Sequence, residues 1–193
     1  MFTSQKSPVG PIIKTSYTSK PIEIPPDFLI ATAPDVKPIT VERIDFSTTA
    51  LPEYVGMYAT VLDNVLSVSE CAELLRLAES ASTTGWQQAL VNAGLGLESF
   101  RPQVRLCERS IWDDREVVKR IWNRCLLADG LESDLRILDK EEIIGELGAQ
   151  RGERWRMTRL NERMRFLKYG SGQYFRRKVI FVEKKPPELT NLS

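Results

Sequence analysis

The prolines of this chain are concentrated near its amino-terminal end, and they limit where regular structure can begin. Seven of the eleven prolines lie at or before Pro38, interleaved with serine, threonine and lysine. Proline has a fixed φ and no backbone N–H, so it interrupts helices and sheet ladders. Such a segment also offers few apolar side chains to offset the entropy of ordering its backbone. The sequence therefore predicts a disordered arm over residues 1 to 45 and a folded part over residues 46 to 177.

Length, charge and hydropathy are those of an ordinary globular protein. The chain has 193 residues and 42% hydrophobic content, which predicts one packed domain. Its 27 Lys and Arg residues nearly balance its 26 Asp and Glu residues, so the overall charge favours neither nucleic acid nor an anionic membrane as partner. Neither an apolar run long enough to span a membrane nor a secretory signal is visible. We therefore expect a soluble intracellular protein, cytoplasmic or nuclear.

Two amphipathic helices are predicted. Ser67 and Glu70 have the spacing of a capping box, and the apolar positions that follow repeat at helical spacing, which predicts a helix from Ser67 to about Ala81. A second helix is predicted from Asp114 to about Leu126. Asp113 and Asp114 are interpreted as caps of this helix rather than as paired catalytic carboxylates. Both helices are expected to pack on one sheet.

Three strands and two irregular segments complete the predicted domain. Tyr54–Leu62, Val104–Trp112 and Leu160–Tyr169 are rich in apolar and aromatic residues and are predicted as strands. The third carries apolar side chains on both faces, which predicts a central position in a sheet. Gln88–Pro102 contains glycines and has no clear period, so it is predicted as a loop. Leu131–Gly152 is highly charged and is predicted as an insertion or loop.

The chain contains no histidine, and this excludes several kinds of chemistry. Histidine is the most common metal ligand and general base in enzymes, and it activates the serine or cysteine nucleophile in many hydrolases. Cys71, Cys107 and Cys125 are far apart in sequence, with no Cys-x-x-Cys pair to indicate zinc. They are predicted to be reduced thiols. The sequence therefore predicts no catalytic residue and no metal ligand.

The segment LNERMRFLKYGSGQYFRR indicates a family. Together with the order strand, capped helix, strand ending in Arg-Ser and second helix, it resembles the prolyl 4-hydroxylase-like branch of the 2-oxoglutarate- and Fe(II)-dependent dioxygenases. That family follows the pattern Tyr-x-x-Gly-x-x-(Tyr or Phe)-x-x-His-x-Asp, and Tyr169, Gly172 and Phe175 match its first three fixed positions. The two metal-binding positions that follow are occupied by Lys178 and Ile180. The resemblance implies an α+β fold, the amino-terminal part of a double-stranded β-helix (jelly roll) with two supporting helices.

The resemblance also implies a reaction and a set of cofactors. Members of the family oxidise a C–H bond of a protein, peptide or small molecule with Fe(II), oxygen and 2-oxoglutarate, and ascorbate often sustains the iron. Tyr169 resembles the tyrosine whose hydroxyl points toward 2-oxoglutarate, and it is the one cofactor-binding candidate; it is alternatively a strand tyrosine with its polar end in water. Because Lys178 and Ile180 cannot complete the iron site, this chain is expected to be inactive. Residues 178–193 are expected to be an unrelated tail, produced by a retained intron, a truncated gene model or a short isoform.

A second hypothesis rests on the basic segment, which we define as residues 151–178. It holds eight Arg and two Lys against two Glu, interleaved with Trp155, Phe166, Tyr169 and Tyr174. Single-stranded nucleic-acid grooves use such a mixture of cations and rings. Strand alternation places several of these arginines on a solvated face, however, so nucleic acid is not the expected partner. The alternative function is a non-enzymatic interaction module that uses this segment.

Overall fold

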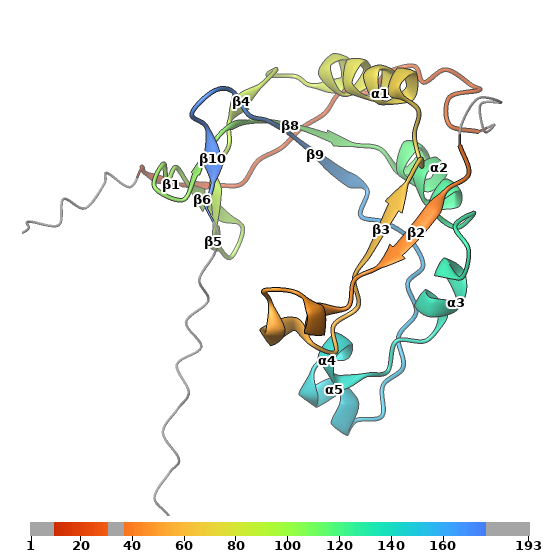
Figure 1. Ribbon diagram of the computed structural model, residues 1–193. Coiled ribbons are helices and arrows are strands. Elements are labelled where there is room, and N and C mark those ends of the chain that lie inside the picture. The colour runs from red at the N-terminus through yellow and green to blue at the C-terminus, as the bar shows by residue number, and fades with distance from the viewer. Residues whose placement is uncertain (1–9, 31–36, 177–193) are drawn as a thin grey trace, which may run out of the picture. The chain divides into compact units, whose positions relative to one another are not determined.

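The computed structural model describes residues 10–30 and 37–176 and divides into two compact units (Figure 1). The smaller unit contains the described residues 10–15, 88–108 and 167–176. The larger unit contains the described residues 16–30, 37–87 and 109–166. The sequence predicted one domain over residues 46 to 177, whereas each of these units also includes residues of the predicted arm. The predicted tail, residues 178–193, lies outside the described residues.

The two predicted helices are present and are capped as expected. Helix α1 spans Val68–Ala81, and Ser67 and Glu70 form the capping box, in which each side chain accepts a hydrogen bond from the other residue's backbone N–H. Helix α2 spans Arg115–Cys125, and the Asp114 carboxylate accepts a hydrogen bond from the backbone N–H of Val117. Such side-chain acceptors satisfy amide groups that have no partner within the helix.

The buried face of α1 is rotated from the one that the sequence predicted. The predicted apolar face comprised Val68, Cys71, Leu74, Leu75 and Ala78. Ala78 is buried and Leu74 packs against the core, whereas Val68 and Leu75 are 90% and 41% exposed. The buried positions are Leu77, Ala78 and Ala81, which also follow helical spacing. They belong to the first core cluster of the larger unit, together with Phe28, Leu29, Trp112 and Val117.

The predicted disordered arm is wrong for residues 16–30. Phe28 and Leu29 are buried in the first core cluster, with 7% and 3% of their surface exposed. The backbone N–H of Lys20 donates to the carbonyl of Ala81, at the end of α1. The Arg120 side chain of α2 donates to the Phe28 carbonyl at 2.7 Å. The prolines do not prevent this packing, because side-chain and isolated backbone hydrogen bonds replace a continuous ladder.

Two short strands also lie in the predicted arm. β1 (Ile12–Lys14) belongs to the smaller unit, and β2 (Thr40–Arg43) belongs to the larger unit. β2 pairs antiparallel with β3 (Thr60–Asp63). The predicted strand Tyr54–Leu62 begins only at Thr60, because its first residue ends the 3₁₀ turn η2 (Pro52–Tyr54) and the chain then turns at Gly56, which has φ of 91°. A further 3₁₀ turn, η1, spans Phe46–Thr48.

The charged segment after α2 is helical rather than irregular. It forms three short helices: α3 (Leu131–Arg136), α4 (Glu141–Ile144) and α5 (Glu146–Gln150). Gly130 precedes α3 and Gly145 lies between α4 and α5, with φ of 74° and 80°, whereas Gly148 lies inside α5. The apolar side of α3 contributes to the second core cluster of the larger unit: Trp122, Ala128, Leu131 and Leu135.

A three-stranded sheet has the order β4 (Gln87–Gln88), β8 (Glu108–Asp113) and β9 (Arg163–Lys168). Strand β9 lies at an edge of this sheet, so the predicted central position of Leu160–Tyr169 is wrong within the described residues. The reason is visible in the exposure of one face: Met164 and Phe166 pack against the first core cluster, whereas Leu167 is 39% exposed.

The smaller unit contains a hairpin where a loop was predicted. β5 (Val91–Gly94) pairs antiparallel with β6 (Leu97–Ser99), and β1 pairs with the other side of β6. Gly94 and Gly96 have φ of 89° and 72°, so the glycines that suggested a loop form the tight turn between the strands. A second pair in this unit joins β7 (Arg105–Leu106) to β10 (Tyr174–Phe175).

The fold is therefore mixed α+β, with several antiparallel sheets and five helices in the described part of the chain. This confirms the predicted class. Among the described strands, none closes a barrel.

A buried ion pair joins the two main helices. The Arg124 guanidinium donates two hydrogen bonds to the Glu70 carboxylate, at 2.8 and 2.7 Å, and a third to the carbonyl of Val65 at 3.2 Å. The two side chains are only 5% and 15% exposed. The hydrogen bonds from Arg124 lower the pKa of Glu70 below its ordinary value. The carboxylate that caps α1 is therefore also the group that holds α2.

We predict that Leu77→Ala lowers the free energy of unfolding by about 2–5 kcal/mol, because it leaves a cavity in the first core cluster. Val68→Ala on the same helix is the control, since Val68 is 90% exposed, and its effect should stay within roughly 0.5 kcal/mol. Urea unfolding followed by circular dichroism measures both. Equal effects of the two substitutions would contradict the packing described above.

We also predict that Glu70→Gln lowers the free energy of unfolding by about 3 kcal/mol at neutral pH, because it leaves the Arg124 charge buried without its partner. The folded-state pKa of Glu70 is depressed, so its contribution is present above the unfolded value of about 4.3 and is lost as the pH falls through the folded value. The stability difference between the wild type and this variant should therefore shrink in acid. Glu73→Gln, which alters the ion pair with Arg76 on the solvent side of the same helix, is the matched control, and a difference that persists in acid would contradict the account.

Candidate functional site

The segment that carries the family resemblance forms a strand, a turn and a second strand. Tyr169 follows directly after β9, and the turn Gly170–Gln173 leads to β10. The backbone N–H of Gly170 donates to the side-chain carbonyl of Gln173 at 2.8 Å, and the backbone N–H of Gln173 donates back to the Gly170 carbonyl at 3.1 Å. Gly172 has φ of 74°, which a side chain would strain. The glycines therefore close a tight turn.

Tyr169 lies beside a thiol and a guanidinium of the smaller unit. Its side chain lies close to those of Cys107 and Arg105, and both influence the pKa of its phenol. Burial of the phenol and, next, its hydrogen bond with Cys107 raise the pKa of Tyr169, while the nearby charge of Arg105 acts in the opposite direction. Cys107 is fully buried, whereas Tyr169 is 45% exposed. The tyrosine thus has one side against the protein and one side open to a ligand.

Phe175, another residue of the family pattern, contacts the same guanidinium. β10 pairs with β7 so that Phe175 lies opposite Arg105, and the Arg105 Cζ lies 4.2 Å from the centroid of the Phe175 ring. The Nε atom of Arg105 is buried and has no hydrogen-bond partner among the described residues. We call Arg105, Tyr169 and Phe175 the Arg105 cluster. A guanidinium next to a phenol presents hydrogen-bond donors of the kind that carboxylates accept.

The donor atoms of this chain do not fit Fe(II). The facial arrangement used by this family needs two imidazoles and a carboxylate, and the 193 residues contain no histidine. Within the described ranges, no group of three or more His, Cys, Asp or Glu residues could hold a metal ion. Lys178 and Ile180, which stand at the family's ligand positions, lie outside the described residues.

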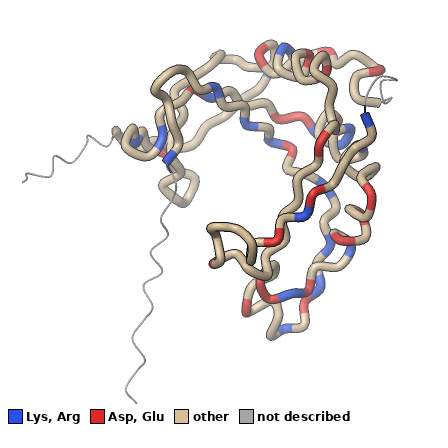
Figure 2. Tube along the Cα trace, viewed as in Figure 1, with Lys and Arg blue, Asp and Glu red and all other residues tan. Residues whose placement is uncertain are grey.

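In the folded chain, nearby carboxylates balance several positive charges of the basic segment. Figure 2 shows basic and acidic residues interleaved along the larger unit. Four arginines of the segment form ion pairs: Arg151 with Glu153, Arg154 with Asp139, Arg159 with Glu162, and Arg163 with Asp113. The last pair is bidentate, so Asp113 is not the helix cap that was predicted. Its hydrogen bonds with Arg163 lower the pKa of Asp113.

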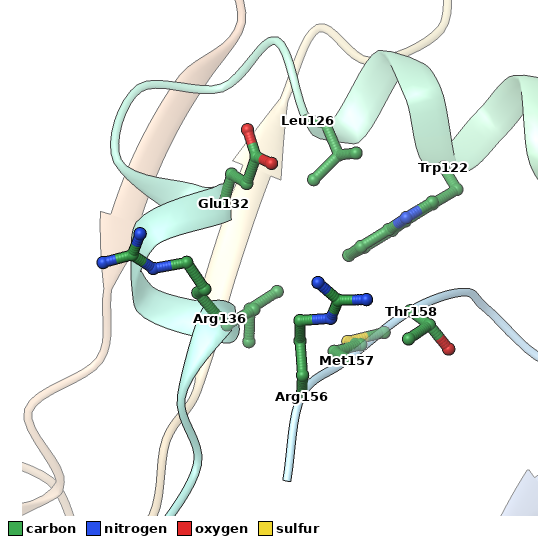
Figure 3. Close-up of a pocket in the computed structure, with 8 residues that line it drawn as sticks. Trp122, Leu126, Glu132, Arg136, Arg156, Met157 and Thr158 are labelled. Atoms are coloured by element: carbon green, nitrogen blue, oxygen red, sulfur yellow. The ribbon is translucent and has the colours of Figure 1, made fainter.

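A cavity of about 220 Å³ lies beside α2 and α3 in the larger unit (Figure 3). We call it the Trp122 cavity; its lining is Trp122, Leu126, Glu132, Leu135, Arg136, Arg156, Met157 and Thr158. The sequence does not indicate this cavity, because α3 falls in a segment that was predicted as irregular and nothing in the sequence pairs it with α2.

Comparison of the chain with family models, with curated proteins and with solved structures finds no match. No helix in the part of the chain that the structure describes has the length and apolar character needed to cross a membrane.

We predict that the Tyr169 phenol titrates above the ordinary tyrosine value, because burial and the hydrogen bond with Cys107 favour its neutral form. The difference in tyrosinate absorbance between the wild type and Tyr169→Phe, recorded as the pH is raised, isolates this group. In Cys107→Ala the same difference should move to lower pH. A Tyr169 phenol that titrates at or below the ordinary value would contradict the placement of these side chains.

Proposed function

We propose that this chain is the amino-terminal part of a 2-oxoglutarate- and Fe(II)-dependent dioxygenase of the prolyl 4-hydroxylase type, and that these 193 residues alone are inactive. In this proposal the described strands are leading strands of a jelly roll, and α1 and α2 are its supporting helices. The order of the two capped helices and the strands around them supports the proposal. Oxidation of a C–H bond of a protein, peptide or small molecule is the activity of the complete fold.

The Arg105 cluster is the observation that carries the proposal. Two of the three matched family positions, Tyr169 and Phe175, are six residues apart in sequence and lie beside one guanidinium from a distant strand. If Tyr169 and Phe175 were ordinary surface residues, nothing would require both to lie beside the same arginine. Gly172 accounts for the remaining matched position, since its positive φ makes the turn that returns β10 to β7.

The chemistry of the cluster fits one carboxylate of 2-oxoglutarate. The Arg105 guanidinium supplies charge and hydrogen-bond donors, and the Tyr169 hydroxyl turns its single proton from Cys107 to the carboxylate when the cosubstrate binds. The Phe175 ring covers one face of the guanidinium and restricts its orientation. The residues of this chain would therefore bind and orient the cosubstrate. Fe(II), oxygen and ascorbate belong to the complete family member, because the present donor set does not fit iron.

The interaction-module hypothesis has less support. An extended cationic surface is needed to bind a polyanion, and four arginines of the basic segment are already next to carboxylates.

A chimeric protein tests the proposal. Residues 1–177 are joined to the carboxy-terminal half of a characterised dioxygenase of the prolyl 4-hydroxylase type, beginning at its His-x-Asp motif. We predict that the chimera binds Fe(II) and converts 2-oxoglutarate to succinate. Tyr169→Phe in the chimera should raise the KM for 2-oxoglutarate by about tenfold, the loss expected for one hydrogen bond to a charged group.

Tyr54→Phe is the matched control, since Tyr54 lies in the other unit, and it should leave the KM unchanged. A folded chimera that binds Fe(II) but releases no succinate would contradict the proposed function. Succinate release that is insensitive to Tyr169→Phe would remove the role assigned to the Arg105 cluster.

A further inference from the structure

The Trp122 cavity has an apolar wall made of core residues. Trp122 and Leu135 are each only 9% exposed, and both belong to the second core cluster. Leu126 and Met157 are partly buried and pack against that cluster. The wall is therefore fixed by the packing of the larger unit, and the flat indole of Trp122 offers a surface for an apolar ligand group.

The backbone on both sides of Arg156 is held in place. The backbone groups of Trp155 and Leu138 exchange two hydrogen bonds, at 2.8 and 2.9 Å, and the N–H of Met157 donates to the carbonyl of Leu135 at 3.1 Å. Arg156 lies between these two anchored residues. In Figure 3 its guanidinium points toward the Trp122 indole, whereas the guanidinium of Arg136 points away from the indole.

Arg156 differs from its neighbours in the basic segment by its lack of a carboxylate partner. Arg154 pairs with Asp139 and Arg159 with Glu162, but among the described residues no ion pair or hydrogen bond includes the Arg156 side chain. Arg136 and Arg156 together outweigh Glu132 among the charged residues that line the cavity. The cavity thus combines an apolar wall with an excess positive charge.

A second cavity, of about 420 Å³, continues along α2 and shares Trp122, Leu126 and Thr158 with the first. Val118 and Leu160 add apolar groups to its lining. The two cavities together provide room for an apolar body longer than a single side chain, at a scale typical of small-molecule sites.

We propose that the Trp122 cavity binds a small monocarboxylate with an apolar body. Its carboxylate contacts the Arg156 guanidinium, which suits a planar anion, and its body lies against Trp122 and extends along α2. The ligand differs in kind from 2-oxoglutarate, which has a second carboxylate and no apolar body. The site is therefore independent of the Arg105 cluster and of the proposed dioxygenase function.

Isothermal titration of the full chain with 4-phenylbutyrate tests this proposal. We expect saturable binding to the wild type, and about tenfold weaker binding either in Arg156→Gln or when the uncharged 4-phenylbutyramide replaces the acid. Arg154→Gln removes the same charge two residues away, outside the cavity lining, and should leave the affinity unchanged. The Trp122 indole N–H resonance, assigned with Trp122→Phe, should shift on titration, and excess 2-oxoglutarate should not displace the ligand.

Several outcomes would overturn the proposal. They are no saturable binding to the wild type, equal affinity for the acid and the amide, equal losses in Arg154→Gln and Arg156→Gln, or binding that leaves the Trp122 resonance unmoved. The comparison of acid with amide uses the wild type alone, so it remains decisive even if a variant is destabilised.

Discussion

The ion pair between Glu70 and Arg124 is the interaction on which the larger unit depends. One carboxylate closes the capping box of α1, receives two hydrogen bonds from α2, and lies next to a guanidinium that also holds the Val65 carbonyl before α1. Burial of a guanidinium is unfavourable unless its partner stays in place, so this pair fixes the start of α1 against the last turn of α2. The first core cluster includes residues of both helices, and the second joins Trp122 of α2 to Leu131 and Leu135 of α3. The packing of α1 against α2 therefore depends on this pair.

Local signals in the sequence predicted the elements whose structure is determined locally. The capping box at Ser67 and the acidic cap at Asp114 each satisfy backbone groups within a few residues, so α1 and α2 could be placed to within about a residue. Glycine did not distinguish a loop from a hairpin, because a positive φ occurs in both. Gly94 and Gly96 form a hairpin turn. The packing of Phe28 depends on a core formed by residues far along the chain, so no nearby residue indicates it.

The same distinction applies to the candidate sites. Tyr169 was found from its spacing to Gly172 and Phe175, which is a local pattern. Arg105 could not be found in that way, because it joins Tyr169 and Phe175 only through the pairing of β7 with β10. Arg156 was noted merely as one charge of a basic segment, since its lack of a partner and its direction depend on α3 and on the hydrogen bonds around Leu135. In both candidate sites, the contacts that could not be predicted are made between segments that lie far apart in the sequence.

We propose that the Arg105 cluster binds the cosubstrate of a dioxygenase, in a chain that lacks the donor atoms for iron. Anaerobic titration of the unfused 193-residue chain with Fe(II), followed by addition of oxygen and 2-oxoglutarate and measurement of succinate, tests it most directly. The account predicts no specific iron binding and no succinate, both for the wild type and for the double variant Lys178→His with Ile180→Asp, since the second histidine is still lacking. Stoichiometric iron binding with succinate release by the wild-type chain would contradict it.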